Sequence, residues 1–125
     1  MNYFWIAFGG ALGSVLRFTS SEWFQSRWPS FPWGTLFVNV LGSLLIGMLA
    51  AMSEAGRLSD SFYLRTFLMI GVLGGFTTFS SFSVQTLLLA RSGAELMAGF
   101  NVLASISLCL CAAWLGFVLG SQFIK

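Results

Sequence analysis

A run of small and hydroxyl-bearing residues lies in the middle of an apolar segment that is long enough to cross a lipid bilayer. Residues 71–83 read G-V-L-G-G-F-T-T-F-S-S-F-S, and the apolar segment extends from about residue 62 to residue 90. The central residues 74–78, two glycines, a phenylalanine and two threonines, favour a break in a membrane helix. A break frees backbone groups that hydrocarbon cannot satisfy, so it is tolerated only where it is buried in protein or lines a polar cavity or an ion site. We therefore predict a functional site here.

The composition indicates an integral membrane protein. Of the 125 residues, 57% are hydrophobic and 8% are charged, whereas about a quarter of the residues in a soluble domain are charged. A helix crosses the hydrocarbon with about 20 apolar residues. We predict an all-α membrane protein with one domain, residues 1–125, and a third helix that is broken near its centre at residues 74–78. The expected spans are residues 3–24, 34–52, 62–90 and 95–123.

Several classes of function and processing are not expected. The chain opens M-N-Y-F-W without the early Lys or Arg of a signal peptide, so we expect the first apolar segment to be retained. There is no histidine and the carboxylates are scattered, which argues against a zinc or di-metal centre. Cys109 and Cys111 point to nearly opposite sides of a helix and cannot pair with each other. No catalytic constellation is recognisable, so an enzyme is not expected.

Glycine pairs at helical spacing predict close contacts between helices. Gly9 and Gly13 in the first span form a G-x-x-x-G face, and Gly116 and Gly120 form another in the fourth span. Such faces let the backbone of a second helix approach closely. We therefore expect both spans to be packed tightly against neighbours.

Residues spaced four apart predict one polar or small stripe on the second span and another on the fourth. The stripes are Asn39, Ser43 and Gly47, and Asn101, Ser105 and Cys109. An amide in the middle of a span needs hydrogen-bond partners or water. Each stripe either bonds a neighbouring helix or contacts a ligand. Two stripes together with a broken helix favour a polar pathway.

Phe79 and Phe82 are three residues apart, so they project from neighbouring ridges of a short helix that starts at the break. This spacing commonly serves packing, but aromatic ring edges beside hydroxyls can also hold a small anion. A permanent cation would release the anion more slowly. Arg17 either pairs with Glu22 or a helix carboxyl end, or places positive charge at a vestibule that attracts anions.

The basic residues do not favour one orientation in the membrane. Three fall on each side: Arg57, Arg65 and Lys125 with the termini, and Arg17, Arg27 and Arg91 opposite. Either one or two buried or poorly placed arginines should not be counted, or the protein inserts both ways and assembles as an antiparallel dimer.

The sequence resembles the Fluc (CrcB) family of fluoride channels over essentially its whole length. In the first span, G-G-A-L-G-S-V-L-R-F is similar to the family's G-G-x-x-G-A-x-x-R-Y. In the second, G-T-L-F-V-N-V-L-G-S is similar to G-T-L-x-V-N-x-x-G-S. The most specific element, G-G-x-T-T-F-S-T-F-S, is matched by G-G-F-T-T-F-S-S-F-S. Three motifs in order on a chain of this length make the resemblance specific.

The resemblance implies an antiparallel, dual-topology homodimer in a bacterial inner membrane, with fluoride pores at its interface and a structural sodium ion at its centre. On this pattern Phe79 and Phe82 match the pore phenylalanines, and Asn39 matches the pore asparagine. The backbone carbonyls of Gly74 and Thr77 match the sodium ligands. The partners implied are fluoride, the lipid bilayer and a second copy of the chain. A nucleic-acid partner is not expected.

The resemblance is less close for other pore positions. Thr78 and Ser80 are neighbouring hydroxyls that line the implied path. Three residues of the fourth span fall where many members carry a polar track of tyrosine and serines: Asn101, Ser105 and Cys109. Asparagine for tyrosine and cysteine for serine change that track. Gln85 stands where some members have a glutamate, so a role for that acid is not carried over.

Together these features predict a passive, highly selective channel that exports fluoride and protects the cell from it. The main alternative is an exporter of the small multidrug resistance type, which needs a carboxylate deep in the membrane. The carboxylates here are at or near span ends, which favours an anion pathway: Glu22, Glu54, Asp60 and Glu95. A third alternative is a structural subunit without ion flux, in which Asn39, Phe79 and Phe82 could be replaced without effect on flux.

Overall fold

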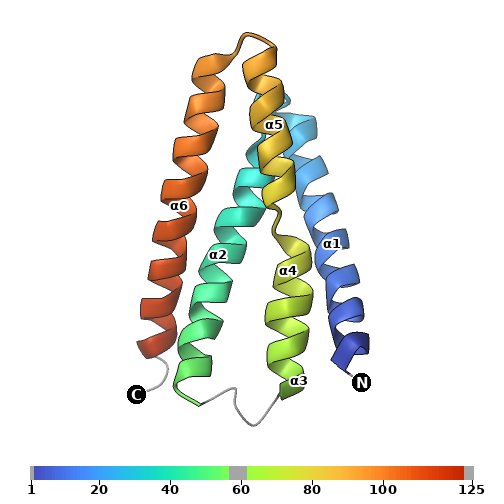
Figure 1. Cartoon of the computed structure of the whole chain (residues 1–125), viewed down its shortest axis with the longest axis vertical. Coiled ribbons are helices and arrows are strands. Elements are labelled where there is room, and N and C mark those ends of the chain that lie inside the picture. Colours follow the sequence, from blue (N-terminus) through green and yellow to red (C-terminus); the bar gives the residue numbers. More distant parts are fainter. Residues whose placement is uncertain (1, 57–61, 123–125) are drawn as a thin grey trace.

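Residues 2–56 and 62–122 are described by the computed structural model, and they are almost entirely helical (Figure 1). The four helical segments are α1 (Asn2–Arg27), α2 (Trp33–Glu54), a composite third segment (62–91) and α6 (Glu95–Gln122). Successive segments run in opposite directions, so both termini lie at the same end of the molecule (Figure 1). The all-α prediction is confirmed. α1 extends to Arg27, three residues beyond the expected end of the first span, and residue 123, the expected end of the fourth span, lies outside the described residues.

The third segment changes its helical form along its length. It consists of α3 (Phe62–Leu64), the π-helix η1 (Arg65–Leu73) and α4 (Gly74–Phe76), followed after two residues by α5 (Phe79–Arg91). No pattern in the sequence predicted the π-helix, a rare form. An interruption was predicted at 74–78, whereas only Thr77 and Thr78 leave the helical conformation. Gly74 and Gly75 remain helical, and α1 packs directly on Gly75.

Close packing of α1 on the third segment depends on missing side chains. A Cβ atom added to Gly9 would lie 2.7 Å from the carbonyl oxygen of Phe67, and one on Gly13 would overlap the carbonyl of Val72. A Cβ on Gly75 would lie 2.5 Å from the carbonyl oxygen of Gly10. The predicted close-packing face of the first helix is therefore confirmed.

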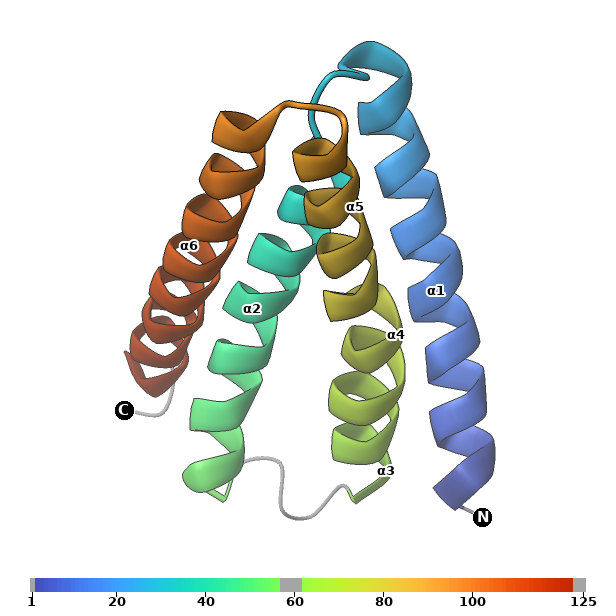
Figure 2. The ribbon, with the colours of Figure 1, turned by 45° about the horizontal axis from the view of Figure 1, so that its top comes forward.

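The most extensive contact between helices joins α2 and α6, which lie side by side in both ribbon views (Figures 1 and 2). Gly116 lies against the carbonyl of Leu44, and a Cβ on Gly120 would be 2.5 Å from the carbonyl oxygen of Met48. The predicted glycine face of the fourth helix is thus confirmed. Gly47, expected in a stripe of small and polar residues, packs against the backbone of α6.

Three described segments are long and apolar enough to cross a membrane: Trp33–Glu54, Arg65–Arg91 and Glu95–Gln122. Their outward faces carry large apolar side chains, such as Leu96, Leu103 and Trp114 on α6. The chain is therefore a multi-pass membrane protein. α1 is 26 residues long but is not in this set, because polar residues such as Arg17 and Glu22 lower its mean hydropathy. A first span at residues 3–24 stays a prediction.

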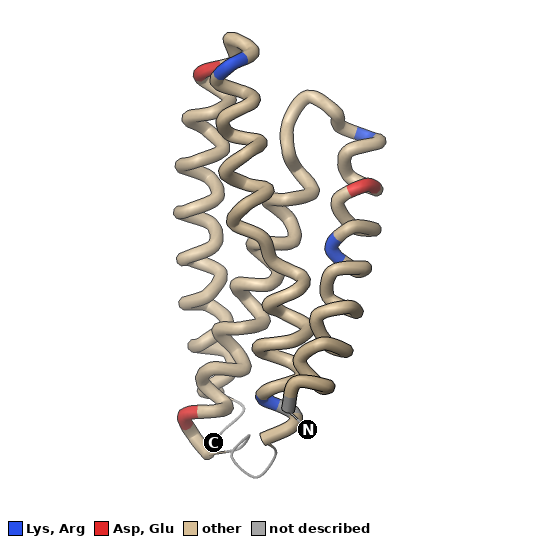
Figure 3. Tube along the Cα trace, turned by 45° about the vertical axis from the view of Figure 1, so that its right-hand side comes forward, with Lys and Arg blue, Asp and Glu red and all other residues tan. Residues whose placement is uncertain are grey.

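Charged residues lie near the two ends of the bundle and along α1 (Figure 3). α1 and α5 end at Arg27 and Arg91, at the end opposite the termini, while η1 begins at Arg65 near the termini. Arg57, Asp60 and Lys125 lie outside the described residues.

Candidate functional site

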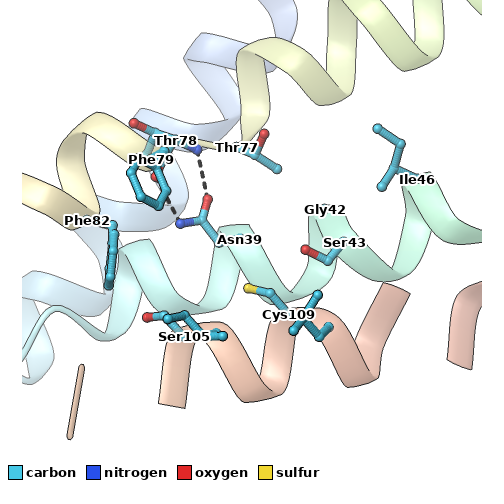
Figure 4. Close-up of a pocket in the computed structure, with 12 residues that line it drawn as sticks. Asn39, Gly42, Ser43, Ile46, Thr77, Thr78, Phe79, Phe82, Ser105 and Cys109 are labelled. Atoms are coloured by element: carbon cyan, nitrogen blue, oxygen red, sulfur yellow. Dashed lines mark hydrogen bonds between the residues drawn. The ribbon is translucent and has the colours of Figure 1, made fainter. Parts of the chain in front are cut away.

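The interruption of the third segment is held by one side chain from α2. Thr77 (φ −89°, ψ 158°) and Thr78 (φ −154°, ψ 118°) are extended. The Asn39 Oδ1 atom accepts a hydrogen bond from the Thr78 amide at 2.7 Å, and Asn39 Nδ2 donates to the Thr78 carbonyl at 2.9 Å (Figure 4). This amide was expected either to bond a neighbouring helix or to contact a ligand, and the structure shows the bond to a neighbouring segment. One Nδ2 hydrogen remains for another acceptor.

Thr78 also begins the helix that carries the phenylalanines. Its hydroxyl oxygen accepts a hydrogen bond from the Ser81 amide at 3.2 Å, as an N-cap residue does. The same oxygen lies 3.2 Å from Ser80 Oγ and donates to Ser81 Oγ at 3.1 Å. Hydroxyl groups are thus gathered at the amino end of α5, where the helix dipole favours negative charge.

A pocket of about 390 Å³ lies between α2, the interruption, α5 and α6 (Figure 4). Seven of the predicted site residues line it: Asn39, Thr77, Thr78, Phe79, Phe82, Ser105 and Cys109. Gly42, which was not predicted as a site residue, also lines the pocket, and its missing side chain makes room for the Thr77 methyl group. The signal was available, because Gly42 is part of the G-S pair in the second motif.

The two phenylalanines share the wall of this pocket but differ in exposure. Their ring centroids are 5.2 Å apart and their planes are inclined by 47°. Phe82 is 8% exposed and is held among neighbours, whereas Phe79 is 76% exposed on the surface of the single chain. The predicted projection from a short helix that starts at the interruption is confirmed, since α5 begins at Phe79.

Residues 4–117 match the family model described as CrcB-like protein, Camphor Resistance (CrcB). This chain belongs to the CrcB family. Curated relatives named "Fluoride-specific ion channel FluC" include one from Opitutus terrae, 53% identical over 93% of this chain and 89% of the relative. Those from Parabacteroides distasonis and Thermus thermophilus are 50% and 48% identical, over 99% and 98% of this chain and 96% of each relative. The resemblance drawn from the three motifs is confirmed.

In this CrcB-family protein, Arg17 lies beside the interruption. Its Nη1 atom donates to the carbonyl oxygen of Thr77 at 3.4 Å. Thr77 directly follows the carboxyl end of α4, so this contact corresponds to the helix-end alternative rather than to a pair with Glu22. A guanidinium is favourable there because the carboxyl end of a helix is its negative pole.

Other predicted site residues of the CrcB-family chain do not line the pocket. Ser80 is exposed on α5, and Gly74 is exposed in α4. Asn101 is 2% exposed, and it donates from Nδ2 to the Thr86 hydroxyl at 2.8 Å. Gln85 has a buried Oε1 atom with no hydrogen-bond partner in the described part of the chain.

Proposed function

We propose that this CrcB-family protein is a passive, fluoride-selective channel that exports fluoride and so protects the cell. The observation that supports it most is the composition of the pocket. Neutral donors, the Asn39 amide and the Thr78 and Ser105 hydroxyls, face the same space as Phe79 and Phe82. The FluC name of relatives up to 53% identical supports fluoride as the ion.

A small, strongly hydrated anion needs replacements for its water, and it must still be able to leave. Amide and hydroxyl donors and the positive edges of aromatic rings supply such replacements without a full charge. Arg17 does not line the pocket but contacts the nearby Thr77 carbonyl. It therefore adds positive potential near the path without binding the anion directly.

No carboxylate of the described residues lines the pocket, which disfavours the small multidrug resistance exporter. That mechanism exchanges protons for cationic drugs at a carboxylate within the membrane. The described acidic residues are instead Glu22, Glu54 and Glu95, near helix ends.

The channel assembles as an antiparallel homodimer in a bacterial inner membrane, with α1 as a first span and the third segment as one broken span. Exposure of Phe79 supports this assembly, because an anion path must be closed off from lipid and the wall of this pocket lies open on one chain. The family resemblance implies that a second copy of the chain covers this open wall. The close relatives from bacteria support the location.

A structural sodium ion is held by the carbonyls of Gly74 and Thr77. In a continuous helix the Gly74 carbonyl would accept from the Thr78 amide, but that amide is bound to Asn39. Within the described residues, the Thr77 carbonyl accepts a long hydrogen bond from Arg17, at 3.4 Å. Both oxygens are therefore suited to a cation at the negative end of α4. Bound there, sodium would satisfy these carbonyl oxygens and hold two subunits together.

Efflux from liposomes tests the function. Vesicles with purified protein and loaded with potassium fluoride are monitored by a fluoride electrode after addition of valinomycin, beside vesicles loaded with chloride. Fast fluoride release with little chloride release is expected, and Phe82→Ile and Phe79→Ile should abolish it. Absence of release from folded wild-type dimers would contradict the channel and leave the structural subunit as the explanation.

A further inference from the structure

Within the described residues, side chains of α2 and α6 form hydrogen bonds to the phenylalanine helix α5 and its N-cap residue at two points. At its amino end, Thr78 is held by both polar atoms of Asn39. Further along, the Thr86 hydroxyl accepts from Asn101 Nδ2 at 2.8 Å. Within the described residues this is the one side-chain hydrogen bond that joins α5 to α6. The two points are eight residues, about 12 Å, apart along the helix, and Phe79 and Phe82 lie between them.

The second attachment leads directly to the pocket wall. The Thr86 hydroxyl donates to the Phe82 carbonyl at 2.7 Å while it accepts from Asn101, so both of its functions are used. On the other side, Ser105 Oγ donates to Asn101 Oδ1 at 3.5 Å. Phe82 and Ser105 both line the pocket, whereas Asn101 and Thr86 do not. A continuous chain of hydrogen bonds therefore joins two walls of the pocket behind its surface.

The hydrogen bonds that join the two pocket walls differ in length, and the short and long bonds have different roles. Those that hold α5 are short, at 2.7 and 2.8 Å. The bond from Ser105 is at the limit of hydrogen-bonding distance, so its hydroxyl can rotate towards the pocket with little loss. Asn101 is 2% exposed, which leaves its amide no access to an ion in the pocket.

We propose that Asn101 is a positioning residue, which sets the place of Phe82 through Thr86 and does not touch the permeating anion. This role rests on the proposed function, because the pocket it shapes is the proposed fluoride path. Loss of the bond lets α5 shift relative to α6 and changes the width of the pocket at Phe82. Both fluoride rate and selectivity over chloride then change.

Nearly isosteric variants test this role in the liposome assay. Thr86→Val and Asn101→Leu each remove the bond, and each is expected to slow fluoride efflux by about two- to tenfold, the factor that corresponds to one hydrogen bond. Both should also lower the ratio of fluoride to chloride efflux. Thr86→Ser keeps the hydroxyl and should retain wild-type rates. The double variant should be no slower than the slower single variant, since the bond between Asn101 and Thr86 is already lost in each.

The melting temperature separates positioning from simple packing. Thr86→Val leaves the buried Asn101 Nδ2 unpaired and should melt lowest. Asn101→Leu, in which the Thr86 hydroxyl still donates to the Phe82 carbonyl, and the double variant should melt closer to the wild type. Fluoride efflux of the double variant should remain slow. If both the efflux and the melting temperature of the double variant returned to wild-type values, the proposal would be overturned. Wild-type efflux in Thr86→Val together with slow efflux in Asn101→Leu would also overturn it. Wild-type protein without efflux would refute the channel itself, a result distinct from either of these.

Discussion

Asn39 and Thr78 are joined by two hydrogen bonds, so one side-chain amide satisfies both backbone groups of a residue outside any helix. The Thr78 amide donates to Asn39 Oδ1 at 2.7 Å and the Thr78 carbonyl accepts from Nδ2 at 2.9 Å. In a membrane segment no water is at hand to replace such bonds. The interruption therefore depends on α2 for its stability.

Replacement of this amide should destabilise the protein more than it changes the shape of the pocket. Asn39→Leu leaves both Thr78 groups unpaired, and each unpaired buried group costs about 1–3 kcal/mol of unfolding free energy. Thermal unfolding in detergent measures this loss. Ser43→Ala is the matched control, because Ser43 lines the same pocket one turn away and makes no hydrogen bond within the described residues. Equal melting temperatures for the two variants would contradict the role of Asn39.

Two glycines of α1 that are three residues apart should respond differently to alanine. Gly13→Ala places a methyl group against the Val72 carbonyl of η1, whereas Gly10→Ala meets no atom within 4 Å in the described structure. Overpacking of this kind costs about 1–3 kcal/mol, while alanine at a helical glycine otherwise stabilises by about 1 kcal/mol. The melting temperature should therefore fall for Gly13→Ala and not for Gly10→Ala. The reverse order would contradict the packing of α1 on the third segment.

The two free cysteines should report the pocket selectively. Cys109 lines the pocket, whereas Cys111 is exposed on α6 and does not. A small methanethiosulfonate reagent is expected to inhibit fluoride efflux of Cys111→Ser, in which Cys109 remains. In Cys109→Ser, the remaining Cys111 should be labelled without loss of efflux. Mass spectrometry measures the labelling, and the fluoride electrode measures the efflux. Inhibition through Cys111 alone would place the ion path elsewhere.

Removal of sodium should destabilise the protein. A ligand that binds only the folded state stabilises it by about 2.7 kcal/mol at one hundred times its dissociation constant. Melting temperature should thus be higher in sodium chloride than in N-methylglucamine chloride. Arg17→Gln should retain this difference, because the proposed ligands are the backbone carbonyls of Gly74 and Thr77. Identical melting curves in the two salts would contradict a sodium site.

Accessibility of single cysteines tests dual topology. Ser30→Cys and Ala55→Cys, each in a chain without Cys109 and Cys111, mark exposed positions at opposite ends of the bundle. With both orientations present, an impermeant thiol reagent added to intact cells should label each about halfway. Complete labelling of one position and none of the other would establish a single orientation.

The predictions that held from the sequence were those that depend on local spacing. The glycine faces at Gly9 and Gly116 contact helices as expected, because residues four apart share one side of a helix. The lengths of α2 and α6 followed from their apolar runs for a similar reason.

What sequence alone missed depends on contacts between segments. The interruption was predicted three residues too wide, at residues 74–76, and the packing of Gly75 on α1 keeps that residue helical against its propensity. The burial of Asn101 behind the pocket depends on the angle between α5 and α6, and no spacing in the sequence reports that angle. Thr86 gave no signal of its own for the same reason.

The two extended residues also determine what mutagenesis can detect. At Thr77 and Thr78 the carboxyl end of α4 and the amino end of α5 face one another across the interruption, so carbonyls lie on one side of it and amides and hydroxyls on the other. The carbonyls belong to the main chain. Every type of residue supplies the same carbonyl group, and residue types differ only in the backbone conformation that they favour. An alanine scan would therefore register the anion side of this region and overlook the cation side, which only changes of salt or of backbone shape would reveal.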